Sequence, residues 1–432
     1  MDCNEQIGKE IMICGFVQAR RDHGKILFLD VLDRSGIIQV VVSGKVEELH
    51  PQDVVCITGK VNKRPEHMVN QNIPTGKIEI SAESIEVLSK AAELPFDMGG
   101  KELDLQLPTL LDYRSLTLRH PRTKAIFQVQ ATILEGFRKT AQELGCSEIV
   151  VPTIVAGATE GGAEVFKVDY FEHKAYLSQS PQLYKQMLVP VFERVFTIAK
   201  AYRAEPSVTT RHLTESTQMD IEIGFVEFED LLDILEGVAV KMLKITEEKC
   251  SDVLSEYGVE KVSFGKIPRL TLREAQELIL KEFGRDERKE KDLTPQDEAD
   301  LCKWSKEKHG SDFVTVTHFP TTAKPFYTKP DPKNPEYSLS YDLLFRGVEI
   351  LSGSQRINDY EQLVENIKSR GMNPVNFEMY LQAFKYGMPS EGGFSFGLER
   401  VTMHVLNLSN IREASLFPRD MERVDIRLGT RG

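Results

Sequence analysis

Apolar segments with strand character succeed one another along the first 88 residues of the chain. Met12, Cys14 and Phe16 alternate with their neighbours, and four apolar runs follow: Ile26–Leu29, Ile37–Val42, Val54–Ile57 and Ile78–Val87. Alternation and short apolar runs of this kind are typical of β-strands. The sequence from Asp33 to Gly36 predicts a hairpin turn between the second and third strands. Five strands in this order predict a small barrel of the OB type in residues 1–88.

The pattern changes after the predicted barrel. Residues 89–122 contain several prolines and glycines with little hydrophobic periodicity, which predicts a hinge or linker between domains. From Lys124 onward, apolar residues recur at helical spacing, and Gly145 marks the end of the predicted helix. The apolar run Ile149–Val151 that follows has strand character.

Helices and strands follow one another without regular alternation in the rest of the chain. The predicted elements are two helices and two strands: Phe228–Ile245, Leu272–Phe283, Phe313–Thr317 and Leu343–Ile350. Residues 284–308 are dense in charge and predict a solvated helical insertion. This irregular order favours an α+β fold for a second domain, residues 123–432, over a doubly wound α/β fold.

Composition narrows the range of function classes. The 432 residues carry a net charge of −12, which favours a metabolic enzyme over a protein that coats nucleic acid. Six cysteines are scattered without paired spacing, so we expect reduced thiols and neither a disulfide framework nor a zinc site. The chain has no run of eighteen apolar residues and no signal-peptide pattern at its start. We therefore expect a cytoplasmic protein without a membrane partner.

Two segments nearly two hundred residues apart place arginines beside carboxylates. The first runs from Arg203-Ala-Glu205 into Arg211-His-Leu-Thr-Glu215, and the second is Gly397-Leu-Glu-Arg400. Arginines in such a setting hold a polyphosphate by charge while neighbouring groups position a second substrate. The sequence lacks the G-x-x-x-x-G-K-[ST] pattern of a phosphate-binding loop, so these segments predict a different kind of nucleotide site.

Several further strings occur in the same order as in one enzyme family. They are T-E-G-G-A-E, Q-S-P-Q-L-Y-K-Q, R-A-E-P-S-V-T-T-R-H-L-T-E, A-K-P-F-Y-T, I-L-S-G-S-Q-R and G-G-F-S-F-G-L-E-R. Nearly the whole chain resembles the archaeal and eukaryotic type of aspartyl-tRNA synthetase, a class II aminoacyl-tRNA synthetase. The resemblance implies an OB-fold anticodon-binding domain, an antiparallel catalytic sheet flanked by helices, and the substrates ATP, L-aspartate and tRNA(Asp). It leaves open whether tRNA(Asn) is charged as well.

The resemblance assigns the residues that activate the amino acid. Arg203 and Arg400 are the expected catalytic residues, because a carboxylate must attack the α-phosphate of ATP and both reactants are anions. The full set of expected ATP-binding residues is Arg203, Glu205, Arg211, His212, Leu213, Glu349, Gly397, Glu399 and Arg400. Magnesium is the expected cofactor, with Glu349 and Ser352 as its contacts and Asp342 as a weaker addition. In isolation, Asp342 and Glu349 also fit solvent-facing positions on a strand.

The resemblance implies that the choice of amino acid depends on Lys185 and Arg356. Two cations facing the β-carboxylate favour aspartate, because asparagine leaves both charges unpaired. The complete set of expected aspartate-binding residues is Glu160, Gln182, Lys185, Arg203, Ser352 and Arg356. The segment 159–163 resembles the family's loop that closes over the amino acid. Without the resemblance, Lys185 fits an ordinary surface position on a helix.

The predicted barrel carries candidate residues for the anticodon. Phe28 and Gln39 resemble the side chains that stack on and hydrogen-bond the central uridine, and Arg21 resembles a contact to the neighbouring nucleotide. By itself, Phe28 fits a core position better than a stacking position. Gln18 and the pair His67-Met68 lie in loops expected near the third anticodon letter. None of them is an arginine or glutamate that would specify cytosine, so relaxed tRNA specificity is an open alternative.

Two positions depart from the family pattern, and a third position, which matches it, suggests a homodimer. Ser216 stands where the family often has the phenylalanine that stacks on adenine, and Ser390-Glu391 replaces the usual Pro-His. Pro152 matches the family's dimer-interface proline, so a homodimer is expected. Two other functions compete: a tRNA-independent amide-forming ligase, which would lack the barrel, and an inactive RNA-binding relative, which would lack Arg203, Glu349 or Arg400.

Overall fold

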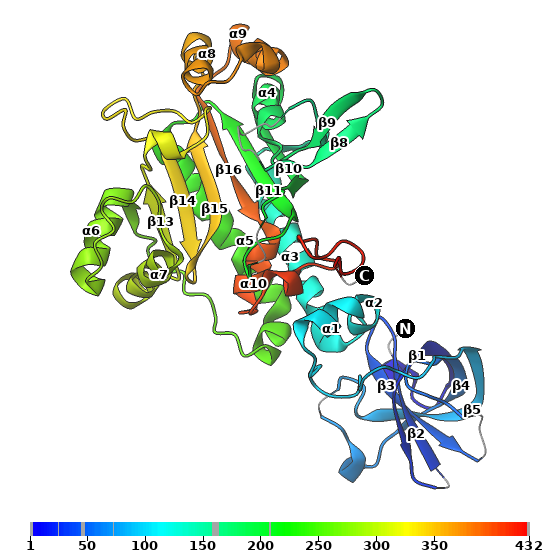
Figure 1. Ribbon diagram of the computed structural model, residues 1–432. Helices are drawn as coiled ribbons and strands as arrows, with labels where there is room; N and C mark the ends of the chain where they lie inside the picture. Colours follow the sequence, from blue (N-terminus) through cyan, green and yellow to red (C-terminus); the bar gives the residue numbers. More distant parts are fainter. Residues whose placement is uncertain are drawn as a thin grey trace. The chain divides into compact units, whose positions relative to one another are not determined.

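The computed structural model describes residues 3–24, 26–44, 48–71, 73–157, 164–206 and 209–429. The chain forms two compact units, Met1–Leu110 and Leu111–Gly432. The helices, besides short 3-10 turns, are α1 (Leu107–Asp112), α2 (Arg114–Thr117), α3 (Pro121–Glu143), α4 (Gln182–Phe192), α5 (Phe228–Glu256), α6 (Leu272–Phe283), α7 (Pro295–His309), α8 (Tyr360–Ser369), α9 (Glu378–Lys385) and α10 (Leu398–Val405) (Figure 1). None of the helices in these ranges combines the length and apolar character that crossing a bilayer requires.

The first unit contains the predicted barrel. Its strands are β1 (Glu10–Asp22), β2 (Ile26–Leu32), β3 (Ile37–Ser43), β4 (Val54–Lys63) and β5 (Ile78–Ser89), which close in the order β1-β2-β3-β5-β4. Side chains such as Leu29, Val40 and Ile57 are fully buried inside the barrel. The predicted turn after Asp33 is confirmed, because the Asp33 carboxylate accepts hydrogen bonds from the backbone N–H groups of Ser35 and Gly36. The five-stranded barrel is therefore confirmed.

The first strand corrects two details of the sequence interpretation. Ile11, Gly15 and Val17 face the interior, whereas Met12 lies on the outer face with 68% of its surface exposed. Cys14 pairs directly with Cys56 of β4, and the two sulfur atoms form a disulfide. The expectation of reduced thiols is wrong for this pair, because spacing along the chain does not reveal which residues face each other across a barrel.

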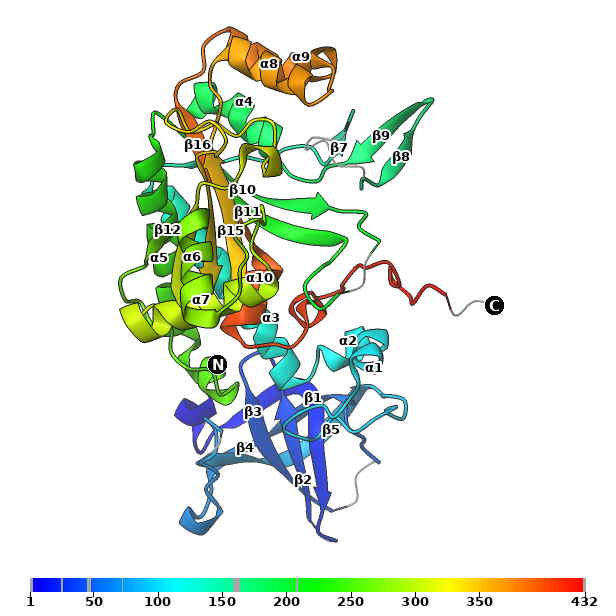
Figure 2. The same ribbon diagram turned by 60° about the vertical axis from the view of Figure 1, so that its left-hand side comes forward.

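The second unit is built on an eight-stranded sheet. Its strand order is β12 (Arg269–Thr271), β13 (Phe313–Thr317), β14 (Ser340–Phe345), β15 (Val348–Gln355), β16 (Glu391–Gly397), β11 (Glu215–Gly224), β10 (Arg194–Tyr202) and β6 (Ser147–Glu148). All neighbours are antiparallel except the parallel pairs β12–β13 and β10–β6 at the two edges. A small sheet of β7 (Ile154–Val155), β9 (His173–Leu177) and β8 (Lys167–Tyr170) lies beside it (Figure 2). This arrangement confirms the predicted α+β class.

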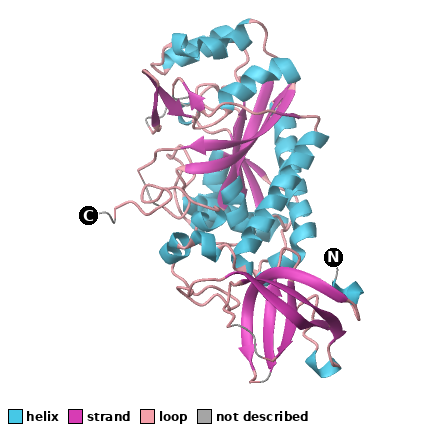
Figure 3. Cartoon of the chain, turned by 90° about the vertical axis from the view of Figure 1, so that its right-hand side faces the viewer, coloured by secondary structure: helices cyan, strands magenta, loops and turns pink. Residues whose placement is uncertain are grey.

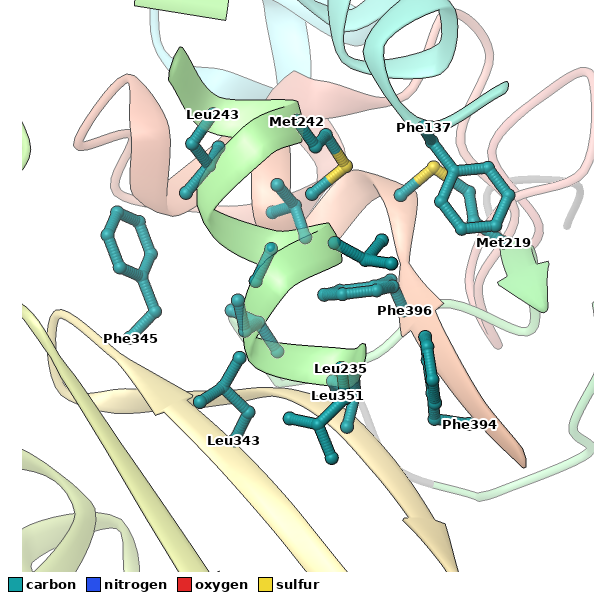
Figure 4. Packing of buried hydrophobic residues seen from close by; sticks show 14 of the residues in the cluster. Phe137, Met219, Leu235, Met242, Leu243, Leu343, Phe345, Leu351, Phe394 and Phe396 are labelled. Carbon is teal, nitrogen blue, oxygen red and sulfur yellow. The ribbon is translucent and has the colours of Figure 1, made fainter. Parts of the chain in front are cut away.

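Helices α3 and α5 pack against each other and against one face of the large sheet. Figure 3 shows helices lying along one side of this sheet. Figure 4 shows Leu235 and Met242 of α5 among Leu351 of β15, Phe396 of β16 and Phe137 of α3. All five side chains are fully buried, and burying each is worth about 1.5–3 kcal/mol. The helices therefore fix the sheet from one side and leave its opposite face available for a site.

Several predicted boundaries in this unit change. The run Leu343–Ile350 is a hairpin rather than one strand, because Arg346 and Gly347 adopt positive φ angles of 47° and 87° and turn the chain between β14 and β15. The helix predicted for 228–245 continues to Glu256. The run Ile149–Val151 is not a strand, and Val150 is 97% exposed.

The charged insertion and the linker also differ from the prediction. Helix α7 supplies the expected helix within 284–308, but Leu301, Cys302 and Ser305 on one of its faces are buried. This insertion therefore packs on the sheet and is solvated on one side only. The linker 89–122 contains the helices α1 and α2 and the start of α3, although its sequence lacks clear periodicity.

Candidate active site

A cavity of about 460 Å³ opens on the face of the large sheet that α3 and α5 leave free. Strands β11, β15 and β16, the start of α10 and the segment 324–328 form its walls. Most of the side chains that line it are polar or charged, with arginines at both ends. A polar cavity with fixed cations is suited to an anionic ligand rather than an apolar one.

The strand register explains why one face of the sheet is polar. Met219, Phe396 and Leu351 are direct partners across β11, β16 and β15, and they point into the helix-covered core. Their chain neighbours Asp220, Ser395 and Ser352 form the adjacent row, and all three line the cavity. Because side chains alternate along a strand, each apolar row beneath the helices implies a neighbouring row that faces the cavity.

The inner end of the cavity rests on a buried cluster of two cations and two carboxylates. Lys185 of α4 is 0% exposed, and its Nζ lies 2.6 Å from Oδ1 of Asp220 and 3.2 Å from Oε2 of Glu222. Arg356 donates from Nε to Oε1 of Glu222 at 2.8 Å, from Nη1 to Oγ of Ser354 and from Nη2 to the Gly393 carbonyl. Each buried charge therefore has a partner of opposite sign.

The two carboxylates of this cluster respond differently to burial. Burial raises the pKa of Asp220 above its ordinary value, although Lys185 opposes that shift. Burial also acts on Glu222, but Arg356 and Lys185 together outweigh it and hold the pKa of Glu222 below its ordinary value. Burial acts against the charged form of Arg356, yet Glu222 raises the pKa of that guanidinium. At neutral pH the cation of Arg356 and the anion of Glu222 are therefore both retained.

The outer end of the cavity carries three arginines in looser ion pairs. Their closest nitrogen–oxygen distances are 3.9 Å for Arg203–Glu205, 3.6 Å for Arg211–Glu298 and 3.6 Å for Arg400–Glu349. The Arg203 side chain is 48% exposed, so it reaches into the cavity rather than into a protein contact. Arg400 also donates a hydrogen bond of 2.9 Å from Nη1 to the Glu349 backbone carbonyl. Guanidinium groups in ion pairs this long can exchange the carboxylates for phosphate oxygens at small cost.

Other predicted nucleotide-binding residues line the same part of the cavity. The Glu399 carboxylate accepts hydrogen bonds from the backbone N–H of Thr217 at 2.9 and 3.2 Å, which joins α10 to β11. His212 shares a hydrogen bond of 2.6 Å with Thr209 through Nδ1, and Leu213 packs in a small apolar cluster. Gly397 ends β16 at the wall of the cavity.

Oxygen donors suitable for a divalent cation lie beside the arginines. Glu349 and Ser352 line the cavity, and burial together with nearby Asp342 raises the pKa of Glu349 to about 7. Asp342 lies below the cavity wall, where its carboxylate accepts hydrogen bonds from Nζ of Lys324 at 2.9 and 3.2 Å. Across the described ranges, no group of three or more His, Cys, Asp or Glu side chains is arranged to hold a metal ion. The donor set fits magnesium, which takes one or two carboxylates and completes its shell with water and phosphate.

The structure brings most of the predicted residues to one cavity. The predicted residues that line it are Gln182, Arg203, Glu205, Arg211, His212, Leu213, Glu349, Ser352, Arg356, Gly397, Glu399 and Arg400. Lys185 and Asp342 lie beneath the wall, each paired with a charged residue that lines it. Glu160, with the rest of the predicted closing loop, falls outside the described residues.

Sequence reasoning missed three charged residues that shape the cavity. Asp220 and Glu222 hold the two inner cations, and Lys324 holds Asp342. The signal for the first two was present, because M-D-I-E-I-G places two acids at alternate positions of a strand rich in apolar residues. Alternate acids in a buried strand need cationic partners, so they indicate a charged site.

The predicted anticodon residues share one outer face of the barrel. Arg21 faces Phe28 across β1 and β2, and Asp30 faces Gln39 across β2 and β3. Phe28 is half-buried and points away from the core, which contains its neighbours Leu27 and Leu29. Both ends of the Arg21 guanidinium pair with Asp30, at 2.7 and 2.9 Å. The structure thus places an aromatic ring, an amide and a guanidinium together on this face.

Comparison with known proteins identifies the class to which this fold and site belong. A family model described as tRNA synthetases class II (D, K and N) matches residues 106–421, and a model of the OB-fold nucleic acid binding domain matches residues 11–88. The first match covers well over half of the chain. The chain therefore belongs to the class II tRNA synthetases of the D, K and N group.

Individual relatives narrow this further. An aspartate–tRNA(Asp/Asn) ligase from Thermus thermophilus is 42% identical, over 98% of this chain and 98% of its own length. An aspartate–tRNA(Asp) ligase from Pyrococcus furiosus is 39% identical over 96% of each chain. The crystal structure of asparaginyl-tRNA synthetase from Pyrococcus horikoshii with asparaginyl-adenylate superimposes with a TM-score of 0.89 at 32% identity, over 97% of each chain. The chain thus resembles enzymes for both amino acids.

Proposed function

We propose that this chain is an aspartate–tRNA ligase. It joins the carboxylate of L-aspartate to the α-phosphate of ATP with release of diphosphate, and it then transfers the aspartyl group to the end of tRNA(Asp) with release of AMP. The observation that carries the proposal is the cavity with cations at both ends. Its inner cations, Lys185 and Arg356, suit a carboxylate side chain, and its outer arginines suit the phosphates of ATP. The names of the similar enzymes support the same activity.

The inner end favours aspartate over asparagine. An ammonium has three N–H donors, and Asp220 and Glu222 take two of those on Lys185. Nη1 of Arg356 has two N–H donors, and Ser354 takes one. Among the described residues, these contacts thus leave one N–H of Lys185 Nζ and one N–H of Arg356 Nη1 unused. Arg356 lines the cavity and could donate to a β-carboxylate, and Lys185 lies beneath the wall and adds its positive charge to the same end. The neutral amide of asparagine would present N–H groups to these cations and leave their charge unpaired.

The outer end positions ATP for attack on its α-phosphate. Arg203 is the most exposed of the three arginines and lines the cavity, so it could bridge the α-phosphate and the attacking carboxylate. Arg211 and Arg400 neutralise the outer phosphates. Glu349, Ser352 and, less directly, Asp342 would hold magnesium, which supplies charge neutralisation for the phosphates.

The barrel face of Arg21, Phe28 and Gln39 would read the anticodon. Stacking on an exposed aromatic ring and hydrogen bonds from an amide recognise an unpaired base. Asp30 holds Arg21 in the free protein, so RNA binding must replace or share that ion pair. Near this face, Gln18, Arg20 and His50 line a cavity of about 740 Å³ within the first unit. Its polar side chains could receive a further base, and the base accepted there would decide between tRNA(Asp) alone and both tRNAs.

A homodimer is part of the proposal. Val150 is 97% exposed and Ile154 is 46% exposed on either side of Pro152, in a protein whose large apolar side chains are mostly covered. Exposed apolar residues close together in sequence are typical of a surface that a second copy covers.

The test measures amino-acid activation and tRNA charging separately. Exchange of labelled diphosphate into ATP should require aspartate and should not proceed with asparagine. Arg203→Ala should abolish this exchange and leave the fold intact, because the side chain is about half exposed. Aminoacylation of separate tRNA(Asp) and tRNA(Asn) transcripts then measures tRNA specificity. Exchange with asparagine, or exchange without any charging of tRNA(Asp), would contradict the proposed function.

A further inference from the structure

A fifth ionisable side chain, Glu391, lies beneath the amino-acid end of the cavity and has no role in the chemistry proposed above. Glu391 begins β16, is 0% exposed and pairs with Gly224 in the strand register. Glu222, two residues from Gly224, is therefore its diagonal neighbour on the same face of the sheet. The Glu391 backbone carbonyl also accepts a hydrogen bond of 2.9 Å from the N–H of Arg356. These contacts place the Glu391 side chain directly beside the carboxylate that holds Arg356.

The hydrogen bonds around Glu391 leave one of its oxygens without a donor. Oε1 accepts a hydrogen bond of 2.7 Å from Nε2 of Gln186, and Oε1 of Gln186 in turn accepts one of 3.1 Å from the Tyr380 hydroxyl. Oε2 of Glu391 is buried and has no hydrogen-bond partner among the described residues. The Glu391 carboxyl group as a whole lies within hydrogen-bonding reach of the Glu222 carboxyl group, its diagonal neighbour in the sheet. Two ionised carboxylates cannot form a hydrogen bond with each other, because both only accept. A proton on one of the two carboxyl groups would allow a hydrogen bond between Glu391 and Glu222.

The charges of the site identify which carboxyl group carries this proton. Lys185 and Arg356 balance Asp220 and Glu222, so an ionised Glu391 would leave one uncompensated negative charge in a dry environment. Burial and the neighbouring Glu222 raise the pKa of Glu391 well above its ordinary value. Arg356 and Lys185 hold the pKa of Glu222 low, so the proton resides on Glu391. The charged and titratable groups around the pair are Lys185, Asp220, Tyr327, Tyr341, Arg356 and Tyr380.

We propose that Glu391 is a positioning residue that sets the amino-acid specificity of the site as a neutral carboxylic acid. Its O–H donates to Glu222, which keeps Glu222 directed at Arg356 and keeps the inner cluster uncharged overall. A neutral cluster accepts the extra negative charge of a β-carboxylate. An ionised Glu391 would repel that carboxylate and compete for Arg356, which would favour the uncharged side chain of asparagine. The identity of the amino acid rests on the proposed function, whereas the shared proton does not.

The shared proton has a spectroscopic signature. A protonated carboxyl group has a C=O stretching band that a carboxylate lacks, so the infrared spectrum of the wild type minus that of Glu391→Gln should contain this band. Asp297→Asn is the matched control, because Asp297 is equally buried but paired with Arg285 at 2.7 Å. Its difference spectrum should contain carboxylate bands only. Carboxylate bands alone for Glu391→Gln would overturn the proposal, whatever the enzyme activates.

Diphosphate exchange tests the effect on specificity. Glutamine is neutral and can still donate to Glu222 and accept from Gln186, so Glu391→Gln should keep the KM for aspartate of the wild type. Leucine can do neither, so Glu391→Leu should raise that KM roughly tenfold or more with the KM for ATP unchanged. A KM for aspartate that falls tenfold in Glu391→Gln would show that the native residue is ionised. Wild-type kinetics in both variants would show that Glu391 only fills space. Failure of every variant and the wild type to activate aspartate would instead contradict the proposed function, and the infrared result would stand.

Discussion

Replacing Lys185 separates its structural role from its role in binding aspartate. Its ammonium group is 0% exposed and lies 2.6 Å from Asp220 and 3.2 Å from Glu222. Lys185→Met keeps the length of the side chain but leaves Asp220 without its cation. Removing one partner of a buried ion pair costs about 3–5 kcal/mol, which corresponds to a change of about 10²–10⁴-fold in the unfolding equilibrium. We therefore expect a clearly lower denaturant midpoint for this variant.

A second substitution should restore stability but not function. In Lys185→Met combined with Asp220→Asn, the lysine and its closest carboxylate are both neutralised, and the Ser395 hydroxyl can donate to the new amide oxygen as it does to the Asp220 carboxylate. The double variant should regain most of the lost stability, and the difference gives the coupling energy of the pair. Both variants should lose about 10²-fold or more in kcat/KM for aspartate, because the substrate carboxylate loses a buried cationic partner. Affinity for ATP should persist in both.

The pH dependence of the single variant provides an independent check. Burial already raises the pKa of Asp220 in the folded protein, and removing Lys185 raises it further. A carboxyl group whose pKa is higher in the folded than in the unfolded protein lowers the free energy of unfolding as the pH rises. The stability deficit of Lys185→Met should therefore be small in mild acid and grow toward neutral pH, whereas the double variant should show no such trend. Full aspartate activation by the double variant would refute the reasoning, because Lys185 would then serve only to neutralise Asp220.

Three further predictions concern other parts of the molecule. Phe28→Ala should weaken tRNA charging but spare diphosphate exchange. Phe16→Ala on the same barrel is the control and should change neither activity. Equal loss of both activities in Phe28→Ala would place the anticodon face elsewhere. Val150→Asp should shift the sedimentation profile from dimer to monomer, whereas Val375→Asp, which is also at an exposed valine, should not. Burial and nearby Arg211 lower the pKa of His404 to about 4. The neutral imidazole should therefore contribute about 2–3 kcal/mol to the free energy of unfolding above pH 6.5, and this contribution should be lost as the pH falls to about 4. Acid unfolding curves of His404→Leu should lack this loss, and an unchanged curve would contradict the assignment.

The sequence predicts those elements whose pattern is local. The helix 272–283 and the strand 313–317 have the predicted bounds, because capping residues and apolar runs mark their ends. The hairpin between β14 and β15 was missed because both strands are apolar and only Arg346-Gly347 interrupts them. The Cys14–Cys56 pair depends on the register of β1 and β4, which no spacing along the chain specifies.

The site shows the same division between local pattern and tertiary context. The motif residues Arg203, Arg211 and Arg400 could be found from sequence, because arginines beside acids form a recognisable string. The partners that hold the inner cations could not be assigned, because Lys185 is on a helix and Asp220 is on a strand 35 residues away. Only folding of α4 onto β11 brings them together. Glu391 appeared in the sequence as a departure from a family pattern, and its contacts with Glu222 and Gln186 give it a physical meaning.

The ion pairs of the cavity differ in strength between its two ends. The inner and lower pairs are Lys185–Asp220 at 2.6 Å, Arg356–Glu222 at 2.8 Å and Lys324–Asp342 at 2.9 Å. The outer pairs are Arg400–Glu349 and Arg211–Glu298 at 3.6 Å and Arg203–Glu205 at 3.9 Å. The first three pairs are almost fully buried, whereas the arginines of the outer three are about one third to one half exposed.

This gradient has a consequence for how the two substrates bind. Short, buried pairs resist exchange because separating them leaves a charge in a dry environment, so the inner end keeps its geometry and selects the side chain that fits it. Long, solvated pairs cost little to separate, so phosphates can replace the carboxylates of Glu205, Glu298 and Glu349 on the arginines. In the proposed mechanism, Glu349 would then be available to a divalent cation bound with the phosphates, which would supply charge neutralisation. Glu349 would thus balance Arg400 in the free site and contact the metal in the occupied one.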